Sequence, residues 1–190
     1  MKKKISKKEL KEKRHRRWVL IITLSTFFLT MLFSYISDFL LSNTPIFVAF
    51  IILFLIVLLG ILADIIGVAV TAVSLEPFNA MASKRIKGAK TSVDLVKNAS
   101  RVSNFCNDVI GDICGIVSGA TTITIVIQLG THYPLLNVAV ITLILSSVVA
   151  CITVGGKALG KDLAMKNGTA IIHGISSLIA SFKITFRGKE

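Results

Sequence analysis

Four long apolar stretches constrain this chain more than any other feature of its sequence. They cover Trp18–Leu41, Ile46–Ser74, Ser103–Leu129 and Leu135–Val154. About 20 apolar residues in a helix cross the hydrocarbon core of a bilayer, so each stretch is long enough to span it. A mean hydropathy of +0.77, with 53% hydrophobic residues, is too apolar for one soluble domain of this length. The sequence therefore predicts an all-α integral membrane protein with four transmembrane helices.

The net charge of +12 comes from three basic segments that flank these stretches. Ten of the 22 Lys and Arg lie in residues 1–17, six in 75–102 and six from Lys157 onward, whereas the connections SNTP and GTHYP contain none. Because basic residues accumulate in short cytoplasmic loops, we expect a multi-pass protein of the cell membrane with both termini cytoplasmic. Basic residues at that surface also attract anionic inner-leaflet lipids. No aromatic residues interleave with them, so we expect no nucleic-acid partner.

The same pattern predicts the organisation of the chain. Residues 1–17 form a basic cytoplasmic arm, and residues 18–41 form a first transmembrane helix that is retained as an anchor. Apolar residues recur at three and four among the lysines of 75–102, which predicts two short amphipathic helices broken near Gly88. A similar cytoplasmic segment is expected over 157–179, with one helix ending at Gly168, followed by a basic tail over 180–190.

Catalytic motifs are absent from the sequence. It contains no paired nucleophile and base, no HExxH and no phosphate-binding loop. The three cysteines have no CxxC or Cys/His spacing, so we interpret them as apolar fillers and not as zinc ligands. We therefore expect a protein that is not an enzyme.

Polar residues inside the second and third stretches are the main functional signal. On an α-helix, residues three and four apart share a face. This spacing predicts one stripe on the second stretch, Gly60, Asp64, Gly67 and Thr71, and one on the third, Asn104, Asn107, Asp108, Gly111, Asp112, Gly115, Ser118 and Gly119. The two helices run in opposite directions and place Asp64 and Asp112 at a similar depth, so we expect the stripes to face each other and three carboxylates to converge.

Charged groups within the bilayer are costly unless they are paired, protonated or hydrated, and they are functional by default. The functional interpretation is a divalent-cation site whose metal ligands are Asp64, Asn104, Asn107, Asp108 and Asp112. Carboxylate and amide oxygens that leave several waters in place suit Mg²⁺. A proton relay along the carboxylates is a second interpretation. A third is a buried polar network that only holds the helices together.

Three segments in order resemble the transmembrane domain of the CNNM/CorC (CorB) family. AVTAVS (Ala69–Ser74) ends a stretch as in the family, and ASRVSNFCNDVIGD follows a basic segment and opens the next stretch with asparagines. GGKALGKDLAMKNGTAIIHGISSLI is similar to the family's exit from its last span. The resemblance covers residues 46–179 and implies a homodimer that exports Mg²⁺ or exchanges it for Na⁺.

The chain also departs from the family pattern. It has an extra first span, and the resemblance implies a short form without the family's paired CBS module and further soluble domain. The sequence DIIGVAV lacks the serine and glutamate of the corresponding family motif, and Lys157 stands roughly where the family has a glutamate. The family site is therefore not copied intact.

Two functional hypotheses remain open. In the first, Asp64, Asp108 and Asp112 rebuild a carboxylate site with Lys157 outside it, and the protein transports a divalent cation. In the second, Lys157 pairs with Asp108 or Asp112 and replaces the cation, which leaves a non-transporting scaffold or regulatory subunit. We favour the first, because one lysine cannot neutralise three carboxylates.

Overall fold

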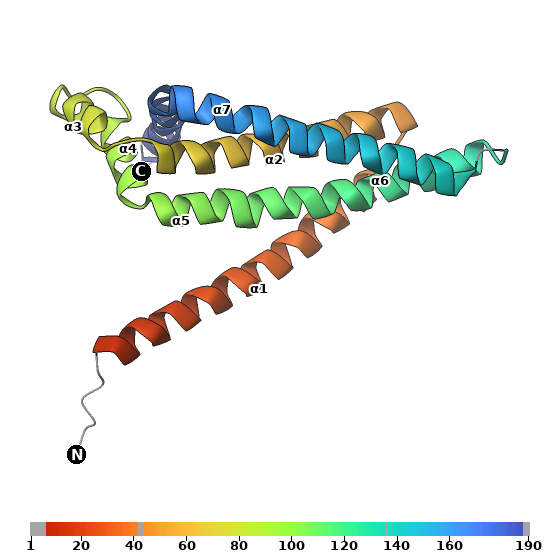
Figure 1. The fold of residues 1–190 in the computed structure, drawn as a ribbon, viewed down its shortest axis with the longest axis horizontal. Helices are drawn as coiled ribbons and strands as arrows, with labels where there is room; N and C mark the ends of the chain where they lie inside the picture. The colour runs from red at the N-terminus through yellow and green to blue at the C-terminus, as the bar shows by residue number, and fades with distance from the viewer. Residues whose placement is uncertain (1–6, 42–43, 136, 188–190) are drawn as a thin grey trace, which may run out of the picture.

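A computed structural model describes residues 7–41, 44–135 and 137–187, with side chains placed at 16–37, 39, 44–135 and 137–181. All regular structure in these ranges is helical (Figure 1). The helices are α1 (Lys7–Leu41), α2 (Ile46–Ala72), α3 (Glu76–Ser83), α4 (Ala89–Lys97), α5 (Ala99–Asn104), the π-helix η1 (Phe105–Gly111), α6 (Asp112–His132) and α7 (Val138–Arg187).

Within the described ranges, four helical segments are long and apolar enough to cross a membrane. They are Arg16–Ser37, Ile46–Ala72, Ala99–His132 and Val138–Ser181. Their outward faces carry large apolar side chains such as Phe27, Phe54 and Leu143, which are 62%, 57% and 69% exposed. A surface of this kind suits hydrocarbon and not water. The molecule therefore has the architecture of a multi-pass membrane protein, as the four apolar stretches predict.

Helix α2 is the central element of the bundle. It packs along α7 on one side and along η1 and α6 on the other (Figure 1). The helix begins directly after Pro45, whose fixed φ of −56° suits a helix start. Helix α1 contacts α6 and is inclined to the other long helices, so that its Lys7 end lies away from them (Figure 1). Where α1 packs on the bundle, its residues Ile22 and Leu29 contact the buried residues Val109 of η1 and Ile113 and Val117 of α6.

Two short helices lie at the end of the bundle where α2 stops. The expected break near Gly88 is confirmed, since α3 ends at Ser83 and α4 begins at Ala89. Gly88 has φ +81°, a left-handed conformation in which glycine has no Cβ to clash. The expected end of a helix at Gly168 is only a kink: the helical backbone is interrupted at Asn167 (φ −117°, ψ 19°), and α7 then continues in a new direction (Figure 1).

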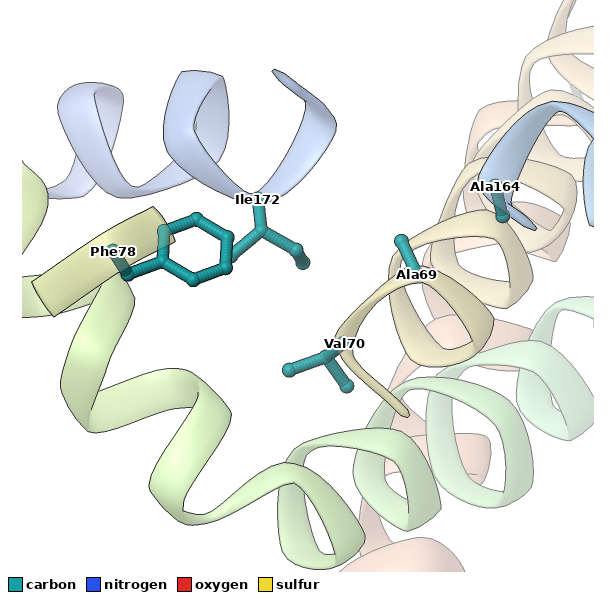
Figure 2. Packing of buried hydrophobic residues seen from close by; sticks show 5 residues of the cluster. All are labelled: Ala69, Val70, Phe78, Ala164 and Ile172. Carbon is teal, nitrogen blue, oxygen red and sulfur yellow. The ribbon is translucent and has the colours of Figure 1, made fainter. Parts of the chain in front are cut away.

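An apolar cluster fixes this end of the bundle. Phe78 of α3 lies against Ile172 in the second part of α7, and Ala69 of α2 approaches Ala164 in the first part (Figure 2). Val70 of α2 points away from Ala164, toward the side of Phe78 and Ile172 (Figure 2). All five side chains are fully buried. The cluster therefore joins α2, α3 and both parts of α7 across the kink.

The predicted basic arm and tail lie partly outside the described residues. Residues 1–6 and 188–190 are among those not described, whereas the chain from Lys7 is already helical and continuous with the first span. Basic residues of 84–101 lie on or beside α3, α4 and α5, at the end of the bundle opposite the start of α2 and the end of α6 (Figure 1).

Candidate functional site

Glycines on α2 let η1 and α6 approach the helix closely. A Cβ built on Gly60 would lie 3.0 Å from the Cβ of Cys114 and 3.9 Å from the backbone oxygen of Gly111. A Cβ on Gly67 would overlap the side-chain amide of Asn107. The expectation that the two stripes face each other therefore holds for these members. We call the group formed by Asp64, Asn107 and Lys157 the polar seam.

Asp64 is the buried carboxylate of the seam. It is 7% exposed, and its Oδ1 lies 4.0 Å from Nζ of Lys157, which reaches over from α7. A hydrogen bond between an ammonium and a carboxylate measures about 2.7–2.9 Å, so this contact is a Coulombic pair and not a tight hydrogen bond. The second carboxylate oxygen, Oδ2, is buried and has no hydrogen-bond partner. Asp64 is thus only half satisfied by the protein.

Asn107 presents a second unsatisfied oxygen on the opposite wall of the seam. Its Nδ2 donates to Oγ of Ser103 over 3.4 Å, while its Oδ1 is buried without a partner. Gly67, over which the amide lies, is one helical turn from Asp64 on the same face of α2. Buried polar atoms nearly always have partners, so two orphaned acceptors beside one ion pair indicate a place for a donor, a water or a cation.

Unpartnered buried atoms are not confined to the seam. Nε2 of His173 and Oγ of Ser176, both in the second part of α7, also have none. The two oxygens of the seam differ from these because they are both acceptors and because one belongs to a carboxylate. An acceptor-only pair is suited to a positively charged ligand.

The remaining predicted metal ligands lie elsewhere. Asp108 is exposed and, with Asn104, borders a groove of about 210 Å³ against Trp18 and Thr23 of α1. Asp112 is also exposed. Within the described residues, no three His, Cys, Asp or Glu side chains are close enough to share a metal ion. The expected convergence of three carboxylates is therefore not found within one chain, and the five-residue ligand set stays a prediction.

The π-helix explains why the predicted stripe divides. Hydrogen bonds from i to i+5 in η1 place one more residue in the turn than an α-helix has, so the three-and-four spacing no longer keeps side chains on one face. Asn107 and Gly111 turn inward to α2, whereas Asp108 and Asp112 turn outward. π-Helices are rare, appear mostly as single-turn bulges inside α-helices, and occur frequently at functional sites. No periodicity in the sequence signals this one.

Lys157 occupies a different place from the two that the sequence predicts, which are outside the carboxylate site or paired with Asp108 or Asp112. The structure corrects both expectations, since its described contact is with Asp64. Its Nζ also lies 3.6 Å from the position of a Cβ on Gly111, which places the ammonium between all three walls of the seam. The absence of a side chain at Gly111 leaves room for this reach. Sequence analysis does not reveal the contact, because Lys157 follows the predicted end of the last span.

A second buried polar contact joins α1 to α6. The hydroxyls of Ser37 and Thr121 are 2.8 Å apart and share a hydrogen bond, and both residues are buried. Neither residue belongs to a sequence motif, so sequence analysis does not identify the pair. The contact fixes the first span against the third at a depth removed from the seam.

The fold and the seam define a class: a helical protein with four potential membrane spans and, among the described residues, one buried carboxylate facing a lysine between them. Comparison of the chain with known protein families, with curated proteins and with solved structures finds no match. The likeness to the CNNM/CorC transmembrane domain accordingly has the support of the quoted motifs alone.

Proposed function

We propose that the protein is a membrane transport protein that moves a cation through the polar seam between α2, η1 and α7. One observation supports this more than any other: Asp64 is almost fully buried, yet its Oδ2 has no partner, and Oδ1 of Asn107 near the same face has none either. Carboxylate and amide oxygens are hard ligands, and Mg²⁺ commonly takes one or two carboxylates and keeps several waters. Mg²⁺ is therefore the cation we propose first.

Lys157 acts in this proposal as an internal competitor for the cation. At about 4 Å and an effective dielectric of about 20, two unit charges interact by about 4 kcal/mol, and a dication would be repelled about twice as strongly. The ion can therefore occupy the seam only when the ammonium moves away from Asp64. The side chain is 26% exposed at one edge of the seam, and a lysine stem is flexible, so such a movement requires no change in the backbone.

The arrangement of the chain in the membrane is part of the same proposal. Basic residues gather at the α3–α4 end of the bundle, which supports a cytoplasmic location for that end and for both termini in the cell membrane. A homodimer, implied by the family resemblance, has support in an outward-facing groove of about 300 Å³ between α6 and α7. Small residues such as Gly115, Gly119 and Ser146 border this groove, and small residues favour close helix packing in membranes.

A specific observation also favours a second function. The contact between Lys157 and Asp64 supplies the seam with its own cation. In that case the protein is a non-transporting scaffold or regulatory subunit, and the ion pair serves only to hold α2 and α7 in register.

The test compares ion effects on three forms of the purified protein, the wild type and two variants. If the seam binds Mg²⁺, saturating Mg²⁺ should raise the unfolding temperature by about 5 °C through ligand linkage. Asp64→Asn should abolish the shift, and Asp94→Asn, an exposed carboxylate on α4, should leave it unchanged. Vesicles containing the wild type should take up or release Mg²⁺ faster than vesicles containing Asp64→Asn.

The variant Lys157→Gln distinguishes the transport proposal from the scaffold proposal. Under the transport proposal it removes the competitor and increases the apparent affinity for Mg²⁺. Under the scaffold proposal it destabilises the protein, and no cation restores the loss. The absence of any shift with millimolar Mg²⁺, Mn²⁺ and Ca²⁺ in both the wild type and Lys157→Gln would refute the transport proposal.

A further inference from the structure

A basic hollow lies at the turn between α3 and α4. Its volume is about 510 Å³, and Ser83, Arg85, Lys90 and Thr91 border it together with apolar atoms of Ile86 and Ala180. The hollow is separate from the polar seam, since none of its bordering residues belongs to α2, η1 or the first part of α7. Whatever it binds is therefore independent of the cation proposed above.

Positive charge is concentrated around the hollow without compensation. Four of the seven residues over 84–90 are basic, namely Lys84, Arg85, Lys87 and Lys90, and all four are exposed. Among the residues with described side chains, no carboxylate borders the hollow. Across the described part of the chain, the contact between Lys157 and Asp64 is the only ion pair found, so none of these four cations is neutralised there. An anion is the ligand that such a site attracts.

The hollow has a fixed shape, because several contacts hold the turn that forms it. Backbone N–H groups of Arg85 and Ile86 donate to the carbonyls of Ala82 and Met81 over 3.0 and 3.1 Å. Oγ of Ser177, in the second part of α7, donates to the carbonyl of Lys87 over 3.1 Å. Arg85 itself has φ 54°, a left-handed conformation that is uncommon outside glycine and that the surrounding contacts must maintain.

Gly88 completes the wall of the hollow. A Cβ there would lie 2.7 Å from the backbone nitrogen of Ser177, so only glycine permits the turn to seat against α7. The basic side chains are thus presented by a turn that is clamped between two helices, and not by a free loop.

Apolar side chains at the edge identify the kind of anion. Ile86 borders the hollow and is 42% exposed, and Ala82 and Ala180 border it as well. Helix α3 begins only four residues after α2 ends, so the hollow lies close to the membrane surface in the arrangement proposed above, in which α2 spans the bilayer. A phosphate group with acyl chains beside it fits this combination, whereas a free phosphate leaves the apolar edge in water.

We propose that the α3–α4 hollow binds the headgroup phosphate of an anionic phospholipid from the adjoining leaflet, with Arg85 and Lys90 as its charged ligands. The acyl chains lie along Ile86 and the adjoining Ala180. A bound lipid anchors the turn, and with it the end of α2, at the membrane surface.

The experiment titrates the full-length protein in dodecyl maltoside with dioctanoyl phosphatidylglycerol and measures binding calorimetrically. One saturable site is expected, with binding at least about tenfold tighter than that of dioctanoyl phosphatidylcholine. The variant Arg85→Asn/Lys90→Gln should weaken phosphatidylglycerol binding about tenfold or more. Asparagine is chosen at residue 85 because it tolerates the left-handed conformation.

The matched control is Lys84→Gln/Lys97→Gln, which removes the same charge from the same two helices and their turn but from residues outside the hollow. It should bind phosphatidylglycerol within about twofold of the wild type. Lys90→Arg should also bind normally, and Lys90→Gln alone provides the test if the double variant does not fold. The proposal would be overturned if the control variant lost as much phosphatidylglycerol affinity as the hollow variants, or if the hollow variants lost none. Binding of inorganic phosphate as tightly as phosphatidylglycerol would also overturn it.

Discussion

Helix α2 makes close contacts through glycine with both α7 and η1, and the contacts on these two sides differ in chemistry. Against α7, the glycines belong to α7, and isoleucines of α2 fill the space: Ile61 lies over Gly156, and Ile65 lies over Gly160. Against η1, the glycine belongs to α2, and the polar amide of Asn107 lies over Gly67. One contact is apolar and complete, whereas the other leaves two buried oxygens without partners.

The difference shows how one helix can serve both stability and function. The isoleucine side chains of α2 pack closely over the glycines of α7, and no polar group there needs a hydrogen-bond partner. This contact therefore stabilises the pairing of α2 and α7 whether or not a ligand occupies the seam. The contact with η1 retains unsatisfied polar atoms at a cost in stability, which a protein tolerates where a ligand supplies the missing interaction. We therefore expect substitutions on the two sides of α2 to have different consequences.

The largest expected effect is at the ion pair that borders both contacts. Lys157→Met should lower the free energy of unfolding by about 3 kcal/mol without added cation, because it leaves the carboxylate of Asp64 buried and unpaired. Denaturation in detergent, followed by far-ultraviolet circular dichroism, measures the change. Adding Asp64→Leu should recover most of the loss. Equal destabilisation in the single and double variants would show that the lysine acts through packing and not through charge.

A smaller loss is expected on the apolar side of α2. Gly160→Ala should cost about 1–3 kcal/mol, because its Cβ would lie 2.6 Å from Cγ1 of Ile65. The same denaturation assay with Ile65→Ala/Gly160→Ala should show partial rescue, since the shorter side chain makes room. Cation effects on stability should stay unchanged in Gly160→Ala. A lost cation effect there would remove the distinction between the two contacts.

On the polar side, the effect on stability should be smaller and the effect on binding larger. Gly67→Ala displaces the amide of Asn107, which is the end of a rotatable side chain and can move aside for about 1 kcal/mol. The Mg²⁺-dependent rise in unfolding temperature should disappear even though the protein remains folded. If Gly67→Ala retains that rise, Asn107 is not a ligand.

The smallest effect is expected where a glycine faces no neighbour. No atom lies within 4 Å of a Cβ built on Gly115, so Gly115→Ala should change stability by less than about 1 kcal/mol and in the stabilising direction. Unfolding of dilute protein in detergent tests this. A clear destabilisation that depends on protein concentration would instead place Gly115 in contact with a second copy of the chain.

Much of the fold follows from the sequence. The four long apolar helices, the start of α2 after Pro45 and the break between α3 and α4 at Gly88 are all indicated by apolar runs and by turn residues. The length of α7 is not indicated by the sequence, because Lys157 and the following basic residues are typical of the end of a span. In the structure the helix continues through them to a kink at Asn167, held by the cluster around Phe78 and Ile172. Such tertiary contacts cannot be deduced from local pattern.

The candidate site could be predicted only in part. The buried carboxylate of Asp64 and the facing Asn107 come directly from the spacing of polar residues on two helices. The outward direction of Asp108 and Asp112 cannot be predicted from this spacing. The spacing places them on the inward face only if the helix is α-helical throughout, and η1 is a π-helix. The pairing of Asp64 with Lys157 requires knowledge of how α7 lies against α2, which no residue pattern contains.

The π-helix in the third span makes the seam sensitive to the deletion of a single residue. Loss of a single residue within Phe105–Gly111 would allow ordinary α-helical hydrogen bonding throughout, at almost no change in helix length. The parts of the span before and after the deletion would keep nearly their present orientation, because six α-helical residues turn the chain about as far as seven residues of the wider π-helix. Within the segment, the spacing of side chains around the helix axis would change, which moves the amide of Asn107 relative to Gly67. A deletion of one residue would in this way alter the chemistry of the seam while the membrane-spanning scaffold persists.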